Sequence, residues 1–131
     1  MIKLSDKAKR LIDGRNFANV AVITPEGWPH VTPVWVDRDG DYILLNITKS
    51  RAKFRYIEKN PRVAISIFDM ANPYVNVVIR GRVTEAITNG AEEHIDKMAK
   101  KYFGQEKYPY HQPEDPRILI KVEPLKETGM G

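Results

Sequence analysis

The stretch that decides the fold reads FANVAVIT (residues 17–24), PEG (25–27), HVTPVWVD (30–37), DG (39–40) and YILLNI (42–47). The three longer segments are rich in β-branched and aromatic residues, which favour strands. The two short ones are turns, because Pro fixes φ while Gly and Asp tolerate the conformations that tight hairpins need. Turn signals recur about every 8–12 residues, as in antiparallel barrels and sandwiches. This half of the chain therefore predicts a strand meander.

Outward from this stretch, three more strands are predicted at residues 62–69, 74–87 and 117–123, with Gly81 marking a bulge. Apolar periodicity predicts a helix after Ser5 that ends at Gly14, and two more at residues 51–59 and 91–103, capped by Ser50 and Asn89. Residues 105–116 hold three prolines and read as an ordered loop or lid, and residues 125–131 as a fraying tail. Six strands with short helices in the connections predict a mainly β protein built as a closed or nearly closed antiparallel barrel.

Length and composition narrow the class of protein. The 131 residues fit one domain, 1–131, with a net charge of +4 and a pI of about 9.3. There is no cysteine, which excludes disulfides, thiolate metal sites and a cysteine nucleophile. No apolar run is long enough for a membrane span, and residues 1–7 lack the apolar core of a secretory signal. We therefore expect a cytoplasmic protein with no membrane partner, and the modest basic charge fits a phosphorylated small molecule as well as nucleic acid.

The densest chemical feature is TKSRAKFR at residues 48–55, which follows a strand and opens a helix. Hydroxyls, free backbone N–H groups at a helix start, and Arg with Lys make this an anion site. The alternative, about equally weighted, is a solvated basic helix face. The side chains assigned to that solvated face are Lys49, Arg55, Lys59 and Arg62.

A second feature is WPHVTPVW at residues 28–35, where Pro33 interrupts the strand ladder and two Trp flank His30. Backbone groups left unpaired there could bond the edge of a planar heterocycle, although packing is the preferred role for Trp35 and a structural or exposed role for His30. His94 is expected on a solvated helix face, and no metal site is predicted from three histidines without ligand spacing. No nucleophile elbow or phosphate-binding glycine loop is present, so a cofactor would have to bring its own chemistry.

Taken in order, several short motifs resemble one family. They are PHVTPVW (29–35), DGD (39–41), RAKFR (51–55), NPRV (60–63), NPY (72–74), IRGRV (79–83), HID (94–96), KYFG (101–104) and YPY (108–110). Their order and spacing over about residues 5–124 resemble the pyridoxamine-phosphate-oxidase-like FMN-binding split barrels. The resemblance is greatest to their deazaflavin branch, the coenzyme F420-dependent oxidoreductases.

This resemblance implies a six-stranded antiparallel Greek-key split barrel that forms a homodimer, with a flavin-type cofactor at the dimer interface. It assigns the cofactor phosphate to Thr48, Ser50, Arg51 and Lys53, and the ring to His30, Val31, Thr32, Pro33 and Val34. Weaker carry-overs, from either subunit, are Asn72, Pro73, Tyr74 and Arg80. The Arg-x-His segment that vitamin B6 oxidases carry near the C-terminus is missing, so pyridoxamine phosphate oxidation is not expected.

The leading hypothesis is an oxidoreductase that binds coenzyme F420 and transfers a hydride to a small conjugated acceptor. Alternatives are an FMN-dependent oxidoreductase of the same fold and a non-catalytic flavin or haem carrier. A nucleic-acid-binding barrel is disfavoured because the basic residues gather at one helix without a row of aromatic platforms. No catalytic side chain is assigned, and the proton donor is left open between His30, Tyr110 and water. The acceptor, and whether residues 105–116 form a lid, are also left open.

Overall fold

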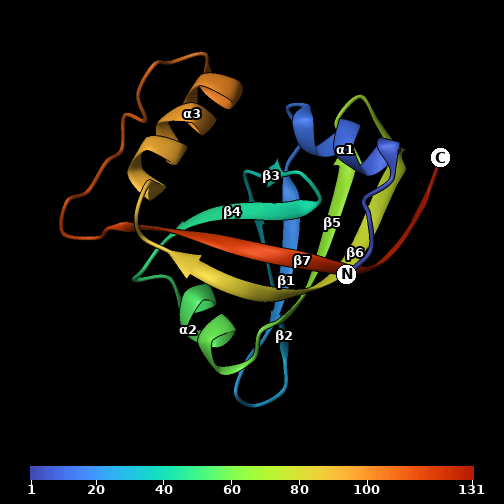
Figure 1. Ribbon diagram of the computed structural model, residues 1–131, viewed down its shortest axis with the longest axis horizontal. Helices are drawn as coiled ribbons and strands as arrows, with labels where there is room; N and C mark the ends of the chain where they lie inside the picture. The colour runs from blue at the N-terminus through green and yellow to red at the C-terminus, as the bar shows by residue number, and fades with distance from the viewer.

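The computed structural model describes residues 1–131, and its strands form one antiparallel sheet in the order β2-β1-β5-β6-β7-β4-β3 (Figure 1). The strands are β1 (Ala18–Ile23), β2 (Pro29–Val34), β3 (Asp37–Asp39), β4 (Tyr42–Thr48), β5 (Arg62–Asp69), β6 (Asn72–Ile87) and β7 (Arg117–Met130). The mainly β antiparallel fold predicted from the sequence is confirmed, with seven strands rather than six. The extra strand is the three-residue β3, of which the prediction places Asp37 at the end of the second strand and Asp39 in the following turn.

Two residues explain why this sheet curls into a barrel. The edge strands β2 and β3 are separated along the chain only by Trp35 and Val36, so the two edges of the sheet must meet at that corner. β2 pairs only with β1 and β3 only with β4, which leaves a seam between the edges. The sheet therefore forms a barrel that is open along one seam.

Three helices fill the connections: α1 (Asp6–Asp13), α2 (Ala52–Lys59) and α3 (Ala91–Phe103). Figure 1 shows α1 on one side of the barrel, and α3 with the 105–116 segment on the other. α3 fixes the seam through Tyr102, whose hydroxyl accepts from the N–H of Val36 at 3.1 Å and donates to the carbonyl of Asn16 at 2.6 Å. The ring of Tyr102 also stacks on Trp35 with centroids 4.9 Å apart. Trp35 thus packs against α3, as predicted, and its ring also borders the cleft described below.

The core fills the inside of the barrel with aliphatic side chains. β1 and β4 bury every second residue, as strands with one face on a core do. Val20, Ile65, Ile79 and Ile120 have no exposed surface. α1 closes the core at one end with Leu11 and Ile12, both on its apolar face.

Two helix caps differ from the predicted ones. Ser5 caps α1 as expected, accepting from the N–H of Ala8 at 3.0 Å. Ser50 does not cap α2, because Arg51 is the N-cap residue and makes no side-chain capping bond. Asn89 does not cap α3 either: Gly90 occupies that position with a φ of 82°, a left-handed conformation that glycine adopts readily.

The prediction of a fraying C-terminal tail is wrong. β7 continues to Met130 because its second half pairs with the first half of β6, from Asn76 to Arg80. The predicted bulge at Gly81 is confirmed, since the register of β6 against β7 shifts between Arg80 and Gly81.

Candidate functional site

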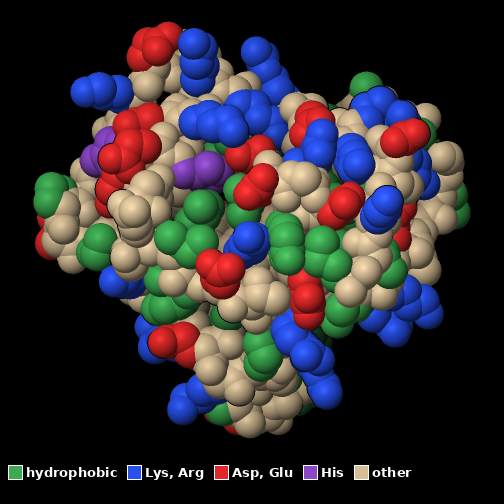
Figure 2. All heavy atoms as spheres, in the orientation of Figure 1, with side chains coloured by type: hydrophobic (Ala, Val, Ile, Leu, Met, Phe, Trp, Pro, Cys, Tyr) green, Lys and Arg blue, Asp and Glu red, His purple; other side chains and the backbone are tan.

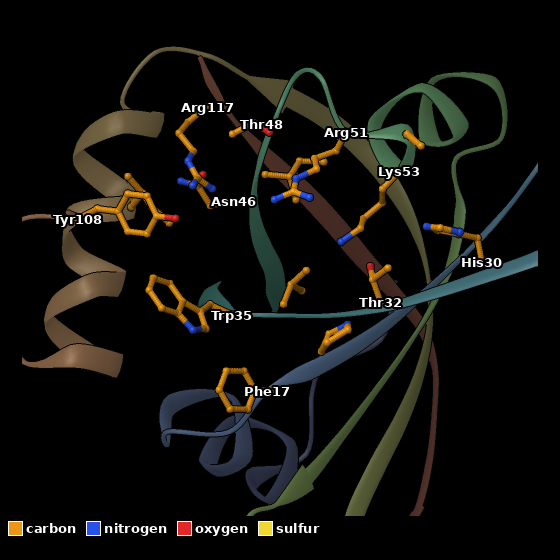
Figure 3. A pocket seen from close by; sticks show the side chains of 15 residues that line it. Phe17, His30, Thr32, Trp35, Asn46, Thr48, Arg51, Lys53, Tyr108 and Arg117 are labelled. Carbon is orange, nitrogen blue, oxygen red and sulfur yellow. The ribbon is translucent and has the colours of Figure 1, made fainter. Parts of the chain in front are cut away.

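A cleft of about 570 Å³ opens at the seam of the barrel, between β2, β4 and the beginning of α2 (Figure 3). Its walls come from segments distant in the chain. They are Phe17, His30, Thr32, Pro33, Val34, Trp35, Asn46, Ile47, Thr48, Arg51, Ala52, Lys53, Ile95, Tyr108 and Arg117. The cleft is therefore open, and it is lined by residues of the strands, of α2 and α3, and of the 105–116 segment.

One end of the cleft is cationic. Lys53 is 7% exposed, and neither it nor Arg51 forms an ion pair with a carboxylate. Burial, with a further contribution from the charge of Arg51, lowers the pKa of Lys53 to about 8. In Figure 3 the Lys53 side chain extends toward Thr32 on β2, with Arg51 beside it. A buried ammonium without a counter-charge is costly, so this end is suited to an anion.

Three buried polar atoms of the chain have no hydrogen-bond partner, and all three belong to the walls of this cleft. They are Thr32 Oγ1, Asn46 Oδ1 and Thr48 Oγ1. Leaving a buried polar atom unpaired costs about 1–3 kcal/mol. Because the three atoms lie together, the cleft is a candidate site for a molecule that would supply the missing partners.

The other end of the cleft is aromatic. Trp35 meets the edge of Tyr108 at a centroid distance of 5.9 Å, and Phe17 stacks against Tyr102 at 5.7 Å. The guanidinium of Arg117 lies 4.7 Å from the centre of the Tyr108 ring. An apolar flat wall with one cation beside it suits a planar conjugated ring that carries oxygen.

A polar hollow adjoins the cleft beneath residues 105–116, and Ser50 lies there rather than in the cleft. The backbone N–H of Ser50 and its hydroxyl donate to the carboxylate of Asp115 at 3.1 and 2.5 Å. The hydroxyl bond lowers the pKa of Asp115. Ser50 is therefore already engaged, and a phosphate would have to displace Asp115 to reach it.

The segment 105–116 is also tied to α3. The two ring nitrogens of His111 lie 3.1 Å from Glu92 Oε2 and 2.8 Å from Asp96 Oδ1. In Figure 2, histidine side chains lie against acidic ones over α3, and the rest of this face mixes both signs of charge. The segment is thus an ordered wall of the site in this structure.

The structure brings seven of the predicted site residues into the cleft. They are His30, Thr32, Pro33, Val34, Thr48, Arg51 and Lys53. Val31 points to the opposite, exposed face of β2. The group Asn72, Pro73, Tyr74 and Arg80 is exposed along β6 and does not line the cleft.

Eight of the fifteen cleft residues were not predicted as site residues, and the three of them with polar groups that matter below are Asn46, Tyr108 and Arg117. The one available signal was Asn46, a polar residue inside the apolar strand YILLNI. The expectation of a solvated His94 is wrong. Its ring is 10% exposed and lies 3.0 Å from both Asp37 Oδ2 and Asn46 Nδ2, because α3 packs this face against β4.

No cluster of three or more His, Cys, Asp or Glu side chains is arranged to hold a metal ion. None of the three helices combines the length and apolarity that crossing a bilayer requires.

Comparison with known sequences identifies the class. The profile of the family described as pyridoxamine 5'-phosphate oxidase matches residues 4–130, and the chain belongs to that family. No curated protein matches the chain.

Solved structures agree with this family. An F420 reductase is similar with a TM-score of 0.80 and 28% identity, over 92% of this chain and 94% of its own. A conserved hypothetical protein from Mycobacterium tuberculosis has a TM-score of 0.71 at 18% identity, over 96% and 84% of the two chains. General Stress Protein 26 from Bacillus anthracis has a TM-score of 0.70 at 17% identity, over 93% and 89%. The last two likenesses show the fold alone. The family includes flavin-binding oxidoreductases, and the fold binds flavin-type cofactors.

Proposed function

We propose that this protein is a cytoplasmic, homodimeric oxidoreductase that binds coenzyme F420 in the seam cleft and serves hydride transfer to a small conjugated acceptor. The observation that supports it best is the cationic end, where buried Lys53 and unpaired Arg51 face Thr32 and Thr48, whose hydroxyls lack partners. These residues fit a phosphate. The similarity to an F420 reductase at 28% identity favours the deazaflavin over FMN.

Different residues along the cleft would bind the phosphate and the ring of the cofactor. Arg51 and Lys53 would hold the phosphate, and Thr32 and Thr48 would hydrogen-bond it or the neighbouring chain. The strand β2, from His30 to Val34, would lie along the ring. A deazaflavin bound there supplies two-electron hydride chemistry. The protein then needs only to orient the acceptor and exclude water, which the aromatic wall and residues 105–116 are placed to do.

A second subunit would complete this site. The outer face of β2, β1, β5 and β6 carries exposed apolar side chains, with Val31 59% and Val78 38% exposed. In the register of the sheet, the row from Val31 runs through Ala21 and Ala64 to Arg80, and Val78 lies in the next row, opposite Ser66. A sheet face on which exposed apolar side chains stand beside small ones favours pairing with a second copy. In such a dimer Tyr74 and Arg80, which do not reach their own cleft, would approach the partner's.

Titration of the purified protein with F420 and with FMN tests the proposal. We expect saturable binding of F420 that is tighter than that of FMN, followed by absorbance and cofactor fluorescence. The same sample, loaded with reduced F420, is then mixed with quinones and enones, and reoxidation of the cofactor is followed. Tighter binding of FMN would move the assignment to the FMN-dependent alternative, and no binding of either would refute the proposal.

The pH dependence of binding should follow Lys53. Its ammonium has a pKa of about 8 in the free protein, and a bound phosphate raises that value. Above pH 8 the complex therefore holds more protons than the free protein does, so affinity falls as pH rises. We expect a loss of up to about tenfold per pH unit. Dissociation constants measured from pH 7 to about pH 9.5 check this, and Lys53→Met should flatten the curve. An unchanged slope in that variant would contradict the assignment.

A further inference from the structure

We propose that Asn46 and Arg117, beside the ring of Trp35, form a subsite for the lactam or imide edge of a flat conjugated ring. Such an edge presents an N–H next to a carbonyl oxygen. The inference deepens the proposed function, and rests on it, by naming the chemical class that the aromatic end of the same cleft accepts.

The amide of Asn46 has one fixed orientation. Its Nδ2 lies 2.8 Å from the carbonyl oxygen of Ala91 and 3.0 Å from Nδ1 of His94. A carbonyl oxygen can only accept, so the amide nitrogen must face α3. Oδ1 is then left without any bond to that helix.

His94 holds this orientation in place. Its Nε2 lies 3.0 Å from Oδ2 of Asp37. Burial opposes ionisation of Asp37, but hydrogen bonds from His94 and from the N–H of Arg38, with the charge of Lys97, lower its pKa to about 2. An ionised Asp37 accepts the Nε2 proton, which leaves Nδ1 as the acceptor for Asn46. The series of hydrogen bonds from Asp37 through His94 to Asn46 thus fixes the orientation of Asn46, with its Oδ1 as a hydrogen-bond acceptor.

That acceptor has no partner, and an unpaired donor lies beside it. Asn46 Oδ1 is buried and makes no hydrogen bond. Arg117 pairs with Thr48, two residues along β4 from Asn46, so both side chains project into the same cleft, and in Figure 3 the Arg117 side chain points toward Asn46. Arg117 packs on Tyr108 and forms no ion pair, so its N–H groups are available to a ligand. An acceptor next to a donor matches an N–H next to a carbonyl.

The same pair argues against a simple anion at this end. A phosphate or carboxylate would satisfy Arg117 but would bring acceptor oxygens against Asn46 Oδ1, which needs a donor. Trp35 adds a flat apolar surface, held by its stacking on Tyr102 with ring planes within 5°. A planar ring carrying the lactam edge satisfies all three groups at once.

Two sources present this chemistry: the ring of the bound cofactor and the acceptor molecule. The first experiment needs neither. The wild-type protein is titrated with 2-quinolone and with N-methyl-2-quinolone, which differ only in the N–H, and binding is followed by protein NMR. We expect 2-quinolone to bind about tenfold or more tightly than the methylated probe. Equal affinities, or no saturable binding of either, would overturn the inference whatever the fate of the F420 proposal.

Variants then locate the contact. Asn46→Leu keeps the size but removes the acceptor, and should abolish the preference for 2-quinolone. Arg117→Gln should weaken both probes, since both keep the carbonyl. Thr32→Val removes the unpaired hydroxyl at the cationic end and should leave the preference intact. If Asn46→Leu does not fold, the preference of the wild-type protein and the affinities of Arg117→Gln still decide whether the subsite exists. A preference that survives in folded Asn46→Leu would overturn the role of Asn46.

A final titration separates the two sources. The protein is saturated with F420 and titrated with 2-quinolone again. Competition assigns the subsite to the edge of the cofactor ring, and independent binding assigns it to the acceptor; both support the subsite. If F420 does not bind at all, the proposed function is refuted. The preference for 2-quinolone over its methylated form, measured in the free protein, still tests the subsite independently.

Discussion

A protein in which Arg51 is replaced by Ala and Lys53 by Met is expected to bind F420 or FMN about 3–6 kcal/mol more weakly than wild type. Each of the two side chains would lose a charged hydrogen bond to phosphate, worth about 1.5–3 kcal/mol. Arg51 lies at the N-cap of α2 and Lys53 within its first turn, and both line the same end of the cleft. The dissociation constant, measured by cofactor fluorescence, should rise by at least about a hundredfold.

The Lys53→Met change alone should increase stability while it weakens cofactor binding. Lys53 is a buried ammonium without a carboxylate partner, and its pKa of about 8 shows that the folded state disfavours its charge. Below pH 8 the unfolded chain keeps that charge at less cost, so the charge destabilises the fold there. Lys53→Met should raise the free energy of unfolding at pH 7 by about 1–3 kcal/mol. A stabilised protein that loses affinity cannot be explained by misfolding.

Two controls make the affinity result specific. Lys59→Met removes the same charge from the exposed end of α2, and should change cofactor affinity by less than about 1 kcal/mol. Riboflavin, which lacks the phosphate, should bind wild type and double variant alike. Unchanged affinity for F420 in the double variant, or an equal loss for riboflavin, would place the phosphate elsewhere.

The fold was largely predictable because its signals are local. Alternating β-branched runs and turn residues specified six of the strands, and the apolar spacing of residues 91–103 specified α3 at its observed bounds. Two predictions failed for different reasons. The second predicted strand breaks at Trp35 and Val36, so Asp37–Asp39 forms the separate strand β3 against its neighbour β4. Residues 125–130 look like a tail, yet they extend β7 because β6 offers a pairing edge.

The site was predictable only where it is contiguous in sequence. The two local pieces, β2 and the start of α2, were both identified, and the structure brings them together across the seam. Asn46 and Arg117 come from strands that meet only after folding, when β4 pairs with β7. Ser50 shows the converse: its position before the helix suggested a phosphate contact, but Asp115, distant in sequence, already accepts its hydrogen bonds. The local sequence predicts candidate site residues, and tertiary contacts determine which of their polar groups remain available to a ligand.

The bulge at Gly81 leads to the second large effect, on stability. A Cβ at this position would lie 2.6 Å from Cγ1 of Val122 and 2.8 Å from the carbonyl oxygen of Glu123. The second contact is with backbone, so it cannot be relieved by a side-chain rotation. Gly81→Ala must therefore push β6 away from β7, the two longest strands of the sheet. We expect the free energy of unfolding, measured in urea, to fall by about 2–3 kcal/mol.

A double-mutant cycle separates this clash from a general loss of strand stability. Val122→Ala alone should destabilise by about 1–3 kcal/mol, because it leaves a gap in the core. In the Gly81→Ala/Val122→Ala variant the clash with Cγ1 is gone. Its loss of unfolding free energy should therefore be smaller than the sum of the two single losses by about 0.5–1 kcal/mol. The remaining deficit belongs to the contact with Glu123, which neither change removes. Additive losses would mean that the bulge absorbs a side chain by opening toward solvent, and that the crowding seen at Val122 does not restrain β6.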